Sequence, residues 1–492
     1  MTIYPLASAT LYVFLVMLSS FIGTINTLYS SRQTAFLCVS LLLYLLSARF
    51  YVGKKIPLRI IIGISICAGG LFIFHALNPS FFSFLQAGNL QFIVATNGGH
   101  NHLGDLAGLG LIALFISPVS LVGQLCIGVF FFLLIIVSFS KSAFLALVIT
   151  LFFMMITKRG KYFFIFIVIA SLAIVSVILY SQEFSSFQPI AQIQSQMKKT
   201  LHLEPKQLIS SRDIYFAQAA QAWMTSSLEH SFFGYGPANF IYASSKSAQS
   251  SWNIISDSHN FLLTTFIESG PLALFWFIIF FVLTVYAGYK TNNPLVFLVL
   301  FLFLNFQTDY TYLIPFFFLS FFFFSGQIIA PLMRTENKTF LHWLICSIFI
   351  LSICSGIYAL YQNQRYTNLN FTLMQYLMKK SPSIDKNVPQ ELEKITPYDE
   401  YLLMNLSLYY EKSGNIKEAV RLLDKLSLYA PHNYLSLLPQ QLDLQIKGRM
   451  NVMSYLESRR KDFARFPFTI KEKKTLNTLC EKYAKISCVS SY

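Results

Sequence analysis

A single histidine with polar neighbours is the strongest chemical feature of this chain. His259 stands between Asp257-Ser258 and Asn260, immediately before a long apolar run. An imidazole with a carboxylate two residues away can titrate near neutral pH, so it can act as a base or polarise a hydroxyl group. A Ser/His/Asp hydrolase with Ser258 or Ser140 as nucleophile is the competing reading. The chain has no G-x-S-x-G nucleophile elbow, which argues against a hydrolase.

Arg212 is the second candidate. Ser210-Ser211-Arg212-Asp213 has the pattern of a capping box and predicts a helix that runs to about His230. A cation in the first helical turn is opposed by the helix dipole by roughly 0.3–1 kcal/mol. A phosphate bound at this helix end would make the position of Arg212 favourable. The alternative is that Arg212 forms an ion pair with Asp213 or with a lipid phosphate. The helix has one apolar stripe, which allows it to lie on the membrane surface or against neighbouring helices: Ile214, Ala217, Ala220, Met224 and Leu228, with Trp223 beside them.

Two further polar segments border apolar runs. Ser140-Lys141-Ser142 carries a lone cation, which either snorkels to lipid headgroups or binds an anion. The segment from Asn97 to Asp105 contains Asn101 and His102. Two histidines at 100 and 102 do not share a helical face, so a helix cap or a substrate contact is favoured over a metal site. We predict neither a metal nor a cofactor.

Glycines and one acidic residue complete the set. Gly234 and Gly236 lie in Phe232-Phe233-Gly234-Tyr235-Gly236-Pro237, which predicts a tight turn with close backbone approach. Glu268 falls inside the apolar run that follows His259. An ionisable residue within a membrane span is a functional candidate by default.

The elements that must position these residues are membrane helices. The chain has 492 residues, of which 55% are hydrophobic and only 12% charged, about half the charged share of a soluble protein. The sequence therefore predicts an all-α polytopic membrane protein. Eleven apolar runs reach about the length of a membrane span: 4–23, 34–52, 57–77, 103–119, 121–138, 142–157, 162–181, 261–289, 294–308, 311–331 and 339–361.

Basic residues orient these runs. The net charge of +15 resides mostly in short loops between apolar runs, which indicates topology and lipid contact rather than nucleic-acid binding. With a cytoplasmic N-terminus, four basic loops fall on the cytoplasmic side. The large loop 182–260, with its amphipathic helix, and everything after 361 then lie outside the cytoplasm. Arg32 is the exception, because this topology places it in a short loop outside the cytoplasm.

We expect two domains, a transmembrane domain over 1–361 and a helical domain over 362–492 on the outer side. Residues 400–431 fit the tetratricopeptide pattern, with Leu403, Leu406, Tyr410, Ala419, Leu423 and Pro431 in the expected places. Such a tail can be structural, or it can dock an acceptor, a glycan or a protein partner. Cys480 and Cys488 either form a disulfide or stay free.

Taken in order, these motifs resemble the O-antigen ligase/polymerase superfamily. That superfamily includes lipopolysaccharide O-antigen ligases, polysaccharide polymerases and protein O-oligosaccharyltransferases. The resemblance covers roughly 80–330, and Lys141 departs from it because the family more often has Arg there. The motifs that carry it are Asn101-His102-Leu103, Ser140-Lys141-Ser142, Arg212, Trp223, Phe233-Gly234-Tyr235-Gly236, His259-Asn260-Phe261-Leu262 and Glu268-Ser269-Gly270.

The resemblance implies an inverting, metal-independent membrane glycosyltransferase of GT-C type in the bacterial cytoplasmic membrane. Its donor would be a glycan on undecaprenyl diphosphate, and its acceptor a lipid A core, a glycan or a protein. Arg212 and Lys141 would hold the diphosphate, and His259 would orient or deprotonate the acceptor hydroxyl. Asn101, His102, Asp257, Asn260, Glu268, Gly234 and Gly236 would support the site.

Two other classes of function remain open. A transporter would show paired broken helices or internal repeats, and the sequence has no convincing pair. A membrane scaffold would give Arg212 and His259 no chemical role.

Overall fold

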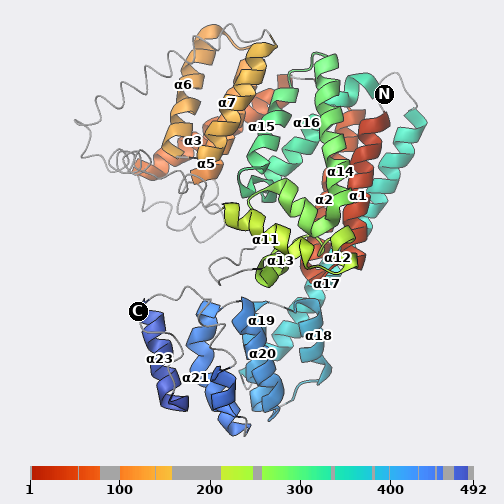
Figure 1. Cartoon of the computed structure of the whole chain (residues 1–492). Helices are drawn as coiled ribbons and strands as arrows, with labels where there is room; N and C mark the ends of the chain where they lie inside the picture. The colour runs from red at the N-terminus through yellow and green to blue at the C-terminus, as the bar shows by residue number, and fades with distance from the viewer. Residues whose placement is uncertain are drawn as a thin grey trace, which may run out of the picture.

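A computed structural model of the chain describes residues 3–53, 55–77, 100–138, 140–157, 212–247, 257–333, 338–378, 383–397, 399–429, 431–448, 451–457 and 470–485. Every regular element in these ranges is helical (Figure 1). The all-α prediction is therefore confirmed. The N-terminus lies at one end of a bundle of long helices, and a smaller set of helices follows its other end.

Apolar helices form the bundle. Among the described residues, six helices are long and apolar enough to cross a membrane, and four shorter helices are also apolar. They match ten of the eleven predicted spans; the run 162–181 lies outside the described residues. They are α1 (Ile3–Ile22), α2 (Thr27–Arg49), α3 (Lys55–Leu77), α5 (His100–Ile116), α6 (Leu121–Ser138), α7 (Lys141–Ile156), α14 (Phe261–Lys290), α15 (Val296–Phe306), α16 (Pro315–Met333) and α17 (Lys338–Leu377).

The core of the bundle is rich in stacked aromatic rings. Phe277, Phe280 and Phe321 are fully buried and contact one another. The outward faces are apolar as well: Phe152 on α7, Phe275 on α14 and Ile357 on α17 are all at least half exposed. Apolar side chains on both the inside and the outside are the pattern of helices surrounded by lipid.

Helix α14 reverses direction at Gly270, whose φ is +83°. The ring of Phe261 lies 4.7 Å from that of Phe277, whereas a straight helix would place these residues roughly 24 Å apart at 1.5 Å per residue. The predicted span 261–289 is therefore two helical segments. The second, Pro271–Lys290, has about the 20 residues that cross a membrane, and the first carries the chain from His259 up to the turn.

Three short helices cap the end of the bundle that faces away from the N-terminus, here called the loop end (Figure 1). They are α11 (Arg212–Met224), α12 (Leu228–Phe233) and α13 (Phe240–Ser247). The prediction of one helix to about His230 is wrong. The Ser226 hydroxyl donates to the Trp223 carbonyl at 2.7 Å, and Ser227 caps a new helix, because serine side chains compete with helical backbone bonds.

The tail begins inside a helix. α17 continues past residue 361, and its Leu373 belongs to the core of the tail. The remaining tail helices are α18 (Asn387–Ile395), α19 (Glu400–Lys412), α20 (Ile416–Tyr429), α21 (Pro431–Lys447) and α23 (Ile470–Ala484).

The expected repeat positions Leu403, Leu406, Ala419 and Leu423 are buried where α19 packs on α20. The tetratricopeptide assignment and the domain boundary stay predictions. Cys480 is buried and disulfide-bonded, and Cys488 lies outside the described residues.

Candidate functional site

His259 lies at the loop end and is one-third exposed. Its φ of +53° is unusual for a residue with a side chain and costs free energy that the surroundings must offset. The Asp257 carboxylate accepts the backbone N–H of His259 at 2.7 Å. Asn260 caps α14 by accepting the N–H of Leu263 at 2.8 Å. These two short-range bonds fix the backbone on either side of the His259 side chain.

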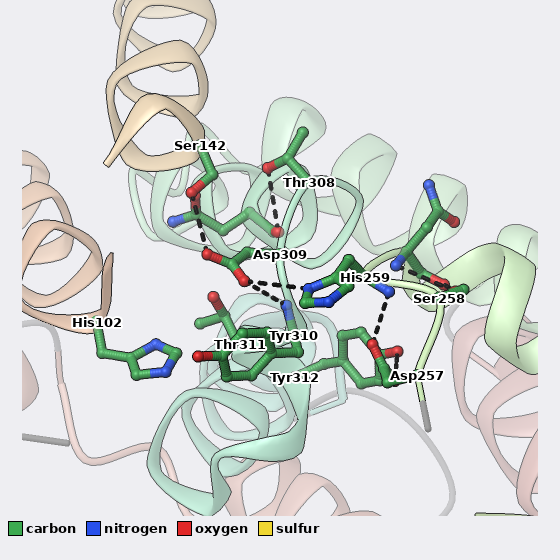
Figure 2. Close-up of polar contacts among 12 residues, drawn as sticks. His102, Ser142, Asp257, Ser258, His259, Thr308, Asp309, Tyr310, Thr311 and Tyr312 are labelled. Carbon is green, nitrogen blue, oxygen red and sulfur yellow. Dashed lines mark hydrogen bonds and ion pairs between the residues drawn. The ribbon is translucent and has the colours of Figure 1, made fainter. Parts of the chain in front are cut away.

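Asp309 faces the imidazole (Figure 2). His259 Nδ1 lies 3.7 Å from Asp309 Oδ1, and the aspartate is almost fully buried. Asp309 also caps the short 3-10 helix η4 (Tyr310–Leu313) through the N–H of Tyr310. Burial alone would raise the pKa of Asp309, but the contact with His259 and the Tyr310 N–H outweigh it and hold the pKa below its ordinary value. Asp309 is therefore a charged partner for an imidazole that takes up a proton.

Asp257 is held from its other side by Tyr312. The buried Tyr312 hydroxyl donates to Asp257 Oδ2 and also contacts the Thr264 hydroxyl at 2.8 Å. Burial raises the pKa of Asp257, even though the bonds from Tyr312 and from the His259 backbone lower it. Asp257 is thus a sequestered backbone anchor for His259, while Asp309 faces its ring.

Aromatic rings enclose the imidazole. Tyr215 of α11 stacks on His259 at 5.7 Å between ring centroids, and Tyr310 meets it edge-on at 5.1 Å. Because these two rings cover part of the imidazole, a substrate can approach His259 only from the side that they leave exposed.

Four helices point their N-terminal ends at this cluster. α14 begins just after His259, and α11 brings Tyr215 from its first turn. α7 brings Ser142, whose hydroxyl donates to Asp309 Oδ2 at 3.4 Å. α5 brings His102, whose ring lies 5.1 Å from that of Tyr310. Helix N-termini carry partial positive charge, so this convergence favours an anion.

Both predicted cations belong to these helix ends. Lys141 is the first residue of α7 and is exposed, next to Ser142 in the cluster. Arg212 is the first residue of α11, one turn before Tyr215; its side chain lies outside the described set, as does that of Asn101. The structure therefore brings the backbones of both cations to the His259 cluster.

His102 forms a second, sealed pair. Its Nδ1 lies 3.5 Å from Asp105 Oδ2, and both side chains are essentially buried. Asp105 also accepts the Thr311 hydroxyl at 2.8 Å. Asp105 thus links α5 to η4 through Thr311, and His102 contacts the site through the ring of Tyr310.

Glu268 has a set of backbone partners. Its carboxylate accepts the N–H groups of Ala238 and Phe240, both at 2.9 Å, at the start of α13. The glycines allow this contact. A Cβ on Gly234 would lie 2.3 Å from the Glu268 carbonyl carbon, and one on Gly236 would lie 2.6 Å from the Thr24 hydroxyl. The glycine-rich turn and the α14 reversal interlock, and Glu268, Gly234 and Gly236 build the support of the site.

Sequence reasoning missed Asp309 and Tyr312. Asp309 stands in the short polar gap between the apolar runs 294–308 and 311–331. By the predicted topology this gap is on the same side as His259, so an acidic residue in it was the available signal. Tyr312 falls inside the predicted span 311–331 and carries no such signal.

Comparison with known proteins adds one finding. Residues 126–278 match the family model described as O-antigen ligase. The match covers α7, α11–α13 and the reversal in α14. No curated protein matches the chain.

Proposed function

We propose that the chain is a member of the O-antigen ligase/polymerase superfamily, because residues 126–278 match the O-antigen ligase family model, and that it transfers a glycan from undecaprenyl diphosphate to an acceptor hydroxyl. The reaction would take place at the outer face of the bacterial cytoplasmic membrane, with a cytoplasmic N-terminus and an outer tail. The observation that carries the proposal is the His259–Asp309 pair, whose imidazole is one-third exposed and which lies near the first turns of four helices.

The acceptor hydroxyl attacks the anomeric carbon of the donor sugar. Its proton passes to His259, and the new glycosidic C–O bond forms as the bond to the diphosphate breaks, with inversion. Undecaprenyl diphosphate leaves. Asp309 offsets the positive charge that the imidazole gains with the proton, because its carboxylate lies 3.7 Å from His259 Nδ1.

Arg212 and Lys141 hold the diphosphate. The placement of both residues at helix starts that touch the His259 cluster supports this assignment, because helix N-termini and cations add up at one anion. Lys141 contributes a point charge rather than the bidentate fork that an arginine would supply. No metal or other cofactor is included in the scheme.

The acceptor decides between three members of the superfamily: an O-antigen ligase, a polysaccharide polymerase and a protein O-oligosaccharyltransferase. The first takes a lipid A core, the second a growing glycan and the third a protein hydroxyl. The tail follows the loop end (Figure 1), and we propose that it docks an acceptor, a glycan or a protein partner. We place the ligase first.

Deleting the gene and measuring the lengths of undecaprenyl-diphosphate-linked glycans tests this proposal. Accumulated finished chains indicate a ligase or a protein transferase, which the missing acceptor product then separates. Accumulated single repeat units indicate a polymerase. Unchanged lipid-linked pools and surface glycans, in a strain with no second enzyme of the family, would contradict transfer and favour a transporter or scaffold.

A further inference from the structure

Helices α11 and α12 expose an unusual amount of apolar surface. We call it the α11–α12 apolar face, and its residues are Phe216 (50% exposed), Trp223 (41%), Met224 (71%), Leu228 (79%) and Phe232 (51%). The stretch from Ile214 to Leu228 contains no charged residue. Contiguous exposed apolar surface of this kind marks an interaction site in a folded protein.

The polarity of α11 is inverted relative to a helix that faces water. Gln218 is buried and accepts the Ser244 hydroxyl at 2.9 Å, whereas Phe216 and Met224 point outward. Gln221 is the polar exception on the outward side. A helix in water turns its glutamines out and its large apolar residues in, so the outward side of α11 fits an apolar medium.

The depth of α12 follows from the two spans on which it docks. A Cβ on Gly270 would lie 2.0 Å from the Phe232 carbonyl oxygen, so α12 sits where the membrane-crossing part of α14 begins. A Cβ on Gly23 would lie 2.2 Å from the Gly234 carbonyl oxygen, so α12 also sits where α1 ends. Two spans of about 20 residues that both end here put α12 at the edge of a roughly 30 Å hydrocarbon layer.

The apolar face is continuous with the lipid-facing surface of the bundle. Trp223 packs on Phe266 of α14 at 5.4 Å, and just beyond the reversal α14 exposes Leu272. At the end of α1, Phe21 is 73% exposed. Tryptophan next to such a surface is typical of a membrane interface.

We infer that the α11–α12 apolar face is immersed in the boundary between headgroups and acyl chains of the bilayer leaflet at the loop end. Trp223 is its anchor. Since Tyr215 of the same helix stacks on His259, α11 is held between the lipid on one side and the site on the other. The inference requires only that the chain is a multi-pass membrane protein and does not rest on the proposed transfer.

Tryptophan fluorescence in nanodiscs tests the inference without any assay of activity. The contribution of Trp223 is the difference in emission between wild type and Trp223→Phe, a change that keeps an aromatic ring against Phe266. We expect lipids brominated near the headgroup to quench this difference more strongly than lipids brominated near the chain end. A difference signal quenched by aqueous iodide and untouched by brominated lipid would overturn the inference and indicate a water-facing or protein-binding surface.

A pair of charged substitutions gives an independent arm. Leu228→Asp places a charge in the apolar face, and Tyr401→Asp places one at a tail residue of similar exposure (73%). Both positions are exposed, so neither change removes core packing. We expect Leu228→Asp to reduce the lipid quenching of Trp223 and Tyr401→Asp to leave it unchanged. Equal quenching in both variants would also overturn the inference.

Discussion

Two imidazole–carboxylate pairs flank Tyr310, and they differ in what can reach them. His259 and Asp309 have side-chain exposures of 33% and 5%, whereas those of His102 and Asp105 are 1% and 0%. His259 comes from a loop with a left-handed backbone, and His102 comes from the first turn of α5.

This comparison shows that residue type alone does not identify the reacting group. Both histidines have an aspartate two or three residues away in the sequence, and both contact the ring of Tyr310. Of the two imidazoles, His259 is the exposed one, so we assign the proposed chemistry to the His259 pair and the positioning of η4 to the sealed pair.

Replacing His259 gives the largest expected effect. His259→Ala removes the proposed base, and positioned general bases contribute about 10²–10⁴-fold to rate. We expect glycan transfer by the purified protein to fall by that factor, with only a small drop in the thermal unfolding midpoint, because the imidazole is partly exposed but contacts Asp309. A variant with wild-type turnover would remove His259 from the chemistry.

Asp309→Asn should be nearly as damaging, by roughly 10²-fold in kcat, because the imidazolium loses its charged partner. The lowered pKa of Asp309 also predicts how the stability of the fold depends on pH. The ionised Asp309 stabilises the fold above the ordinary aspartate pKa of about 3.9, and this contribution is lost as pH falls through the lowered folded value.

The difference in Tm between wild type and Asp309→Asn should therefore be full near neutral pH and shrink below about pH 4. A difference that grows on acidification would contradict the direction assigned to Asp309.

Tyr312→Phe should cause a smaller loss of turnover, about tenfold, because removing one buried hydrogen bond costs on the order of 1–2 kcal/mol. The hydroxyl acts on His259 through Asp257, so the change should lower kcat with little effect on the KM of the donor. Tyr310→Phe is the matched control, since it keeps the ring contact with His259. Equal losses in the two variants would argue against the Asp257 route.

His102→Gln should give the smallest effect on turnover, within about threefold per folded molecule, because the sealed pair does not meet substrate. Its effect should appear in stability instead. Disrupting a buried polar pair costs about 1–3 kcal/mol, measured as a lower Tm in detergent. A loss of turnover as large as that of His259→Ala would erase the distinction between the two pairs.

Much of this architecture could be predicted from the sequence, because apolar runs of about 20 residues have few alternatives to spanning a membrane. His259, Arg212 and Lys141 could be singled out because polar residues at span ends are conspicuous. The reversal of α14 could not be predicted from hydropathy. Glu268-Ser269-Gly270-Pro271 lies in one apolar run, and the turn is seen in the structure, from the φ of Gly270 and the contact between Phe261 and Phe277.

The remaining gaps have similar causes. Asp309 is about 50 residues from His259 in the chain, and their pairing depends on how α14 and α15 pack. Glu268 has the sequence signature of a functional residue, yet its carboxylate binds backbone N–H groups of the turn before α13. An acidic residue inside an apolar run gives the same sequence pattern whether its carboxylate is catalytic or supports a loop.

The most direct test of the central claim is a single-turnover assay in nanodiscs with a defined glycan on undecaprenyl diphosphate and its acceptor, comparing wild type, His259→Ala and His102→Gln. The account predicts that wild type and His102→Gln release undecaprenyl diphosphate and form the glycosylated acceptor, while His259→Ala binds the donor but does neither. Product formation by His259→Ala at the wild-type rate would contradict the account.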